Sequence, residues 1–211
     1  MTVVITASHI DCEERKGFLK KAINSVLLLN VSKHFISLST KEGIVAPKKE
    51  ELSNDERLEI IYSEKRLFQF DHIERLLSKI NDDDKVIMLD DDDLLLEIPK
   101  EDIVKGQQWI PFLSQRPSKE LEQADHTFPF EKVCEKISDL SGYTMTGSIL
   151  KEYFAQREFP ASGILGEKLD NMFKNLEDCR FMNFIDMKGA VKPEKPFVFR
   201  RIWSNPRSWF R

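Results

Sequence analysis

The sequence predicts an α/β fold, with a central sheet of mixed but mostly parallel strands flanked by helices. Two observations support this prediction. Over the first 95 residues, short β-branched or apolar runs alternate with amphipathic segments of helical period, the order that builds a parallel sheet. In addition, Val86–Leu89 is apolar at every position, as expected for a strand buried on both faces. The predicted architecture is therefore Rossmann-like.

The first half of the chain supplies most of the expected sheet. Four strands are predicted, at Thr2–Ala7, His34–Thr40, Leu58–Ser63 and Val86–Leu89. A helix is expected at about residues 12–29, opened by a capping box of Asp11 and Glu14. Asp71 is expected to cap a second helix, which leads into the last of these strands.

The second half has a different character. Several prolines interrupt a long connection, after which a helix is expected near Glu131–Leu140. A strand is then expected at Gly142–Leu150, followed by a helix entered through glycine at Gly163–Leu176.

Length and composition suit one domain over residues 1–211, with halves at 1–95 and 96–211. The net charge of −4 argues against a general binder of nucleic acid or membrane surfaces, which needs a basic stripe. No apolar run is long enough to span a membrane, and no basic leader precedes the first strand, so a cytoplasmic protein is expected. Three widely separated cysteines indicate neither a disulfide framework nor a zinc site.

The strongest chemical signal is Asp90–Asp93, which directly follows the apolar strand. Ligands of open α/β sheets bind at the carboxyl ends of the strands, so these carboxylates lie where a site is expected. Adjacent carboxylates repel one another and favour a hard divalent cation. Because side chains alternate along an extended segment, Asp90 and Asp92 can hold one Mg²⁺ or Mn²⁺. The acidic run Asn81–Asp84 precedes the strand and is expected to be a solvated turn.

Several segments together resemble nucleotide-sugar glycosyltransferases of the GT-A fold. They are Thr6–Ser8 at the end of the first strand, Arg15 with Ala22–Leu27 in the first helix, and Leu89–Asp93. The resemblance covers the first 95 residues, and more loosely 146–148 and 166–170. Within the family, the chain is most similar to the compact glycosyltransferase domain of a multidomain chlorella-virus protein. That similarity implies a viral origin, a place in the host cytoplasm and further domains of a longer polypeptide.

The resemblance implies transfer of a hexose or deoxyhexose from a UDP-sugar donor to a glycan acceptor hydroxyl. Asp90 and Asp92 would hold Mn²⁺ (or Mg²⁺) against the donor diphosphate, where the ion stabilises the leaving UDP. If the transfer inverts, Asp170 would be the general base, with Glu167 as second choice. The implied donor-binding residues are Thr6, Ser8, Arg15, Ser39, Asp71, Asp90 and Asp91.

The chain departs from the family pattern at three places. After the second strand, Ser39–Thr40 stand where most relatives have an acidic pair. After the third strand, Phe70–His72 replace a frequent Arg-Asn, and near the expected base Glu167–Lys168 replace Glu-Asp. The resemblance therefore does not identify which residues contact uracil.

Two other functions are open from the residues alone. A haloacid-dehalogenase-like phosphohydrolase also has an apolar strand running into Asp-x-Asp, and Asp90 would then be the nucleophile. Against it, the motif follows three other strands and no later Gly-Asp-x-x-x-Asp segment is present. A non-catalytic cation- or glycan-binding module would use the acidic run for Ca²⁺, but Asp90–Asp93 contains no glycine of the kind that wraps a Ca²⁺ loop.

Overall fold

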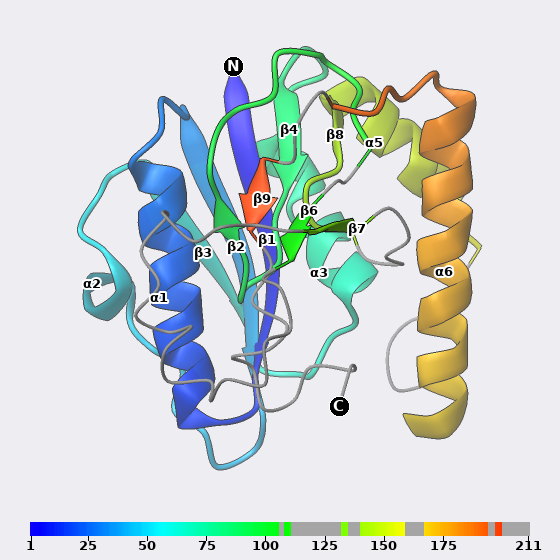
Figure 1. Cartoon of the computed structure of the whole chain (residues 1–211). Helices are drawn as coiled ribbons and strands as arrows, with labels where there is room; N and C mark the ends of the chain where they lie inside the picture. Colours follow the sequence, from blue (N-terminus) through cyan, green and yellow to red (C-terminus); the bar gives the residue numbers. More distant parts are fainter. Residues whose placement is uncertain (106–107, 111–131, 135–139, 159–166, 194–196, 200–211) are drawn as a thin grey trace.

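The computed structural model describes residues 1–105, 108–110, 132–134, 140–158, 167–193 and 197–199 (Figure 1). Its main sheet has five strands in the order β3-β2-β1-β4-β8. Their bounds are β1 Thr2–Ile10, β2 Lys33–Thr40, β3 Leu58–Ser63, β4 Lys85–Met88 and β8 Thr144–Thr146. Only β8 is antiparallel to its neighbour, so the mixed, mostly parallel sheet expected from the sequence is confirmed.

The order of the strands creates a switch point beside β1. The chain runs outward from β1 through β2 to β3, and then returns to pair β4 with the other side of β1. At such a point the connections leave the sheet in opposite directions and open a crevice at the carboxyl ends of the two strands. The residues that follow β1 and β4 therefore meet where a ligand is expected.

A smaller sheet lies in front of the main one in Figure 1. Its strands, in spatial order, are β5 Leu94–Leu95, β9 Val198–Phe199, β6 Gln108–Ile110 and β7 Lys132–Cys134. The strand β7 contradicts the helix expected near Glu131–Leu140; Leu140 is buried and not helical, and the remaining residues of that segment lie outside the described part. Leu95 and Val198 join α1 residues in one buried cluster, which connects this sheet to the main one.

Helices cover both faces of the main sheet. They are α1 Glu13–Leu27, α2 Lys49–Leu52, α3 Gln69–Glu74, α5 Gly147–Ala155 and α6 Glu167–Met187, with a 3₁₀ turn η1 at Leu77–Lys79. Alternation along β1 separates the two faces: Val4 packs with α1, whereas Val3 and Ile5 pack with α3, α5 and α6. No helix among the described residues is long and apolar enough to cross a membrane.

An aromatic core joins α3, α5 and α6. The ring centroids of Tyr153 and Phe181 are 4.9 Å apart, and those of Phe70 and Phe181 are 5.6 Å apart, both at steep angles. Such edge-to-face pairs add to the hydrophobic stabilisation that burial supplies. This core explains why α6, far along the sequence, packs beside the early helix α3.

Arg157, just after α5, ties the same three helices together. Its guanidinium is 2.7 Å from Asp71 Oδ1 and 2.8 Å from Glu74 Oε2, both on α3, and it also pairs with Glu177 on α6. The expected helix cap at Asp71 is wrong, because α3 begins at Gln69 and Asp71 lies inside it. Burying the charge of an arginine costs free energy. The carboxylates of α3 and α6 offset that cost by pairing with the guanidinium.

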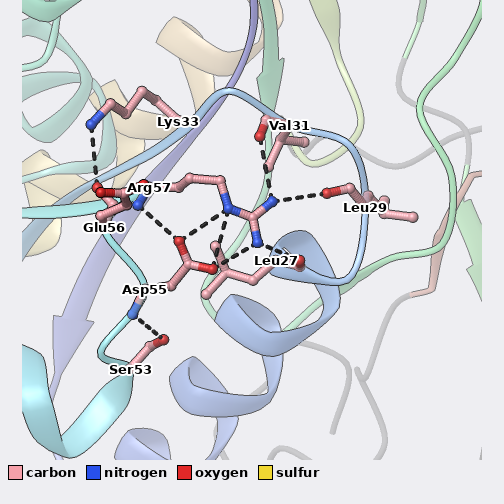
Figure 2. A network of polar contacts seen from close by, with 8 residues as sticks. All are labelled: Leu27, Leu29, Val31, Lys33, Ser53, Asp55, Glu56 and Arg57. Atoms are coloured by element: carbon pink, nitrogen blue, oxygen red, sulfur yellow. Dashed lines mark hydrogen bonds and ion pairs between the residues drawn. The ribbon is translucent and has the colours of Figure 1, made fainter.

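Arg57, just before β3, performs a similar task at the end of α1 (Figure 2). Its Nη2 donates to Leu27 O at 2.7 Å and its Nη1 to Leu29 O at 3.1 Å. Its Nη2 also donates to Asp55 Oδ2 at 2.7 Å. The last carbonyls of a helix have no partner within the helix, so Arg57 satisfies groups that would otherwise need water.

The structure corrects one expected helix start and one expected strand end. The first helix begins after Cys12, whose side chain makes no capping hydrogen bond, so the capping box of Asp11 and Glu14 is wrong. The strand expected at 142–150 ends at Thr146, whose side-chain oxygen accepts from Ile149 N and opens α5. Threonine favours this position because its oxygen replaces a missing helical acceptor.

The turn at residues 81–84 is only partly solvated. Asp84 is 2% exposed, and its carboxylate accepts from the N-terminal amine at 3.0 Å and from Asn81 N at 2.8 Å. Burial raises the pKa of Asp84, but the bonds from Asn81 and the amine outweigh this effect and lower the pKa overall. The expectation of a solvated turn therefore holds for Asp82 and Asp83, which are exposed, and fails for Asp84.

Candidate functional site

Three carboxylates meet at the carboxyl end of β4. Asp90, Asp92 and Asp93 each offer an oxygen within 4.8 Å of the others. The segment is a turn rather than an extension of the strand, since Asp93 N donates to Asp90 O at 3.2 Å. The sequence predicted the pair Asp90 and Asp92 and missed Asp93, because a turn brings together residues three apart that an extended chain separates.

The donor set of this cluster suits a hard cation. It consists of carboxylate oxygens, the ligands that Mg²⁺, Mn²⁺ and Ca²⁺ prefer. Asp93 is buried, whereas Asp90 and Asp92 are half-buried, so the cluster faces both the protein and the sheet edge. The three residues could therefore hold one divalent ion and leave positions for ligand oxygens.

Asp91 faces a different set of partners and anchors the acidic turn. Its carboxylate accepts from Ser8 Oγ at 2.7 Å and from Arg15 Nη2 at 2.6 Å. Burial raises the pKa of Asp91, and Arg15 acts in the opposite direction. For Arg15, burial works to lower the pKa, but Asp91 and Asp92 outweigh it and raise the pKa. The guanidinium therefore stays charged and fastens the turn to α1.

The structure thus brings together three of the residues predicted to bind a donor, Ser8, Arg15 and Asp91. It uses their polar groups on one another. Arg15 Nε is buried and has no hydrogen-bond partner among the described residues. The Arg15 Nε–H could therefore still donate a hydrogen bond to a ligand or a water.

Asp90 has two further contacts that the sequence did not suggest. Gln69 Nε2, in the first turn of α3, donates to Asp90 Oδ1 at 2.8 Å. Asp90 N donates to Ser141 Oγ at 3.2 Å. Both partners are uncharged, and each lies far from Asp90 in sequence. The bond from Gln69 orients the Asp90 carboxylate without neutralising it, and the bond to Ser141 holds the backbone of Asp90.

Two other predicted donor-binding residues are engaged inside the sheet. The Thr6 hydroxyl is 3.0 Å from His34 Nε2, and both side chains are buried. The Ser39 hydroxyl is 2.9 Å from His9 Nδ1 and 2.9 Å from His72 Nε2. The histidines at 9 and 72 were not among the predicted site residues.

The remaining predicted site residues lie away from the acidic cluster or outside the described side chains. Asp71 pairs with Arg157 in the contact between helices described above. Asp170 and Glu167 fall in the first part of α6, and their side chains lie outside the described part of the structure. Their proposed role as a general base stays a prediction.

Comparison with solved structures supports the fold. Two crystal structures of S. aureus TarS match with a TM-score of 0.50 and 12% identity, each over 94% of this chain. The chain spans 36% of one TarS chain and 60% of the shorter TarS 1–349. The galactosyltransferase LgtC, in complex with donor and acceptor sugar analogs, matches at a TM-score of 0.37 and 13% identity, over 98% of this chain and 88% of that chain, a score too low to carry an argument.

Sequence comparisons identify no relative. No protein-family model matches the chain, and no curated protein matches it. At 12% identity the likeness to TarS concerns the backbone and not the side chains of the site. The chain therefore has a GT-A-like α/β fold, with a cluster of three carboxylates at the edge where such sheets bind ligands.

Proposed function

We propose that the protein is a metal-dependent glycosyltransferase that moves a hexose or deoxyhexose from a UDP-sugar to a hydroxyl of a glycan acceptor. One observation carries the proposal: the cluster of Asp90, Asp92 and Asp93 lies at the switch point of a GT-A-like sheet. The resemblance of the first 95 residues to this family supports the same function. A viral origin and a place in the host cytoplasm stay predictions.

Each residue of the acidic turn has its own part in this function. Asp90, Asp92 and Asp93 would hold Mn²⁺ or Mg²⁺, which as a Lewis acid stabilises charge on the leaving diphosphate. Asp91 holds the turn in position through Ser8 and Arg15. Because one carboxylate is neutralised by the arginine, three remain to attract a divalent ion.

Proton removal from the acceptor needs a base in the second half of the chain. We assign this role to Asp170, with Glu167 as second choice, if the transfer inverts configuration. Asp170→Asn should then lower kcat by a factor of about 10² or more and leave UDP-sugar affinity unchanged. Glu167→Gln, one helical turn away, is the variant for comparison. It should lower kcat to the same degree only if Glu167 is the base instead.

Calorimetric titration of UDP, with Mn²⁺ and with EDTA, tests the proposal. Binding should require Mn²⁺, and Asp92→Asn should weaken it by at least about tenfold, since one of three anionic ligands is lost. Asp83→Asn is the matched control, because this exposed aspartate belongs to the acidic turn that precedes the strand. Absence of UDP binding, together with phosphate release from a phosphomonoester, would identify a phosphohydrolase instead.

A further inference from the structure

A chain of hydrogen bonds joins β1, β2 and α3. His9 on β1 bonds to Ser39 on β2 at 2.9 Å, and Ser39 bonds to His72 on α3 at 2.9 Å. His72 Nδ1 is 2.8 Å from Ser37 Oγ, which also receives Arg75 Nη1 at 3.3 Å. We call these five residues the histidine–serine relay.

Only one assignment of donors and acceptors along the relay gives every hydrogen between two of its residues an acceptor. Arg75 can only donate, so Ser37 Oγ accepts from it. Ser37 is fully buried, and the acceptor for its own hydroxyl hydrogen among the described residues is His72 Nδ1. His72 then carries its hydrogen on Nε2. The reverse direction would leave the buried Ser37 hydrogen without an acceptor, at a cost of about 1–3 kcal/mol.

The same direction continues to His9. His72 Nε2–H donates to Ser39 Oγ, and the Ser39 hydroxyl donates to His9 Nδ1. His9 must then carry its hydrogen on Nε2. Burial, with Arg66 adding to it, lowers the pKa of His9 to about 4, and burial lowers the pKa of His72 to about 3. Both rings are therefore neutral at pH 7.

His9 is placed to contact a ligand of the acidic cluster. It is half-buried near the carboxyl end of β1, on the face of the sheet that α3 covers, and Gln69 of α3 bonds Asp90 of the acidic cluster. Its Nδ1 is used by Ser39, and its Nε2 has no partner among the described residues. A neutral N–H donor suits an uncharged acceptor, whereas a phosphate prefers a cation.

We propose that the relay fixes His9 as a specificity-determining donor, whose Nε2–H binds an acceptor atom on the base of the bound nucleotide. This inference rests on the proposed function, because it takes a nucleoside diphosphate to occupy the acidic cluster. Uracil and cytosine both offer such acceptors, a carbonyl oxygen in each and an unprotonated ring nitrogen in cytosine. Ser39, where relatives have an acidic residue, serves here to orient a donor instead.

The test compares UDP, CDP and inorganic pyrophosphate, each titrated with Mn²⁺ into the full chain and into His9→Phe. Phenylalanine keeps a ring and removes the donor, so affinity for at least one nucleotide should fall by about tenfold. Affinity for pyrophosphate should change by less than about twofold, because the metal and phosphate contacts remain. His9→Gln keeps an N–H donor and should restore part of the nucleotide affinity.

Nitrogen-15 NMR of the histidine rings tests the relay without any ligand. At pH 7, the rings of His9 and His72 should both be neutral and protonated on Nε2, with the His9 signals identified by their absence in His9→Phe. Protonation of His9 on Nδ1 would overturn the inference, as would equal losses of nucleotide and pyrophosphate affinity. If the wild-type protein binds none of the three ligands, the proposed function itself fails, whatever the NMR spectrum shows of the relay.

Discussion

Arg157→Met is expected to be among the most destabilising single changes at a polar residue of this protein. The side chain of Arg157 is only 6% exposed, and that of its partner Glu177 only 4% exposed. Methionine keeps much of the packing against the neighbouring rings but leaves two poorly solvated carboxylates, on Asp71 and Glu177, without their cation. Removing one partner of a buried ion pair typically costs about 3–5 kcal/mol. Urea unfolding followed by circular dichroism measures the loss.

A surface ion pair of α5, the helix that ends just before Arg157, provides the control. Lys151 on α5 is 2.6 Å from Asp82, but the two side chains are 37% and 69% exposed. Lys151→Met should therefore cost at most about 1 kcal/mol. If both variants lose the same free energy of unfolding, burial of Arg157 does not make its ion pairs important and the reasoning fails. In the double variant Arg157→Met with Glu177→Gln, part of the loss should be recovered, because a neutral amide replaces the unpaired carboxylate.

Two further predictions concern packing and pH. Gly147→Ala should lower the midpoint of thermal unfolding, although alanine favours helix. The added Cβ would lie 2.0 Å from Asn81 O, so the backbone must shift, at a cost of about 1–3 kcal/mol. A raised midpoint would contradict this close approach. Burial lowers the pKa of His34 from 6.5 to about 3, so protons bind preferentially to the unfolded chain. The stabilisation from neutral His34 is complete above pH 6.5 and falls by about 1.4 kcal/mol per pH unit as the pH decreases toward 3. Urea unfolding of wild type and His34→Gln from pH 7 to pH 5 should show a steeper decrease for the wild type, and parallel curves would refute the assignment.

The predictable part of the fold is the part in which local pattern and final environment agree. The strand Leu58–Ser63 has the predicted bounds. The strand β4, at Lys85–Met88, is shifted by one residue from the predicted Val86–Leu89. The junction after Thr146 was missed because its cause is not local. Asn81, far away in sequence, lies so close that only glycine fits at 147, and there the glycine marks a contact rather than an interruption of a strand.

The candidate site divides in the same way. The acidic residues at 90 and 92 could be found from sequence, because an apolar run that ends in carboxylates is visible without any tertiary contact. The partners of that turn could not, since Ser8, Arg15 and Gln69 reach it from separate elements. Neither could the role of Ser39, which depends on two histidines brought to it by β1 and α3.

Repulsion within the acidic cluster and the bonds made by Asp91 have opposite effects on the acidic turn. Three carboxylates within 4.8 Å repel one another, so on their own they would push the turn apart. The bonds of Asp91 to Arg15 and Ser8 act against that repulsion, because they attach the turn to α1 and β1 through the one aspartate that does not belong to the cluster. A divalent ion would then meet ligands already in place, and less of its binding energy would be used to order the turn. The arginine thus serves the acidic cluster by holding its neighbour.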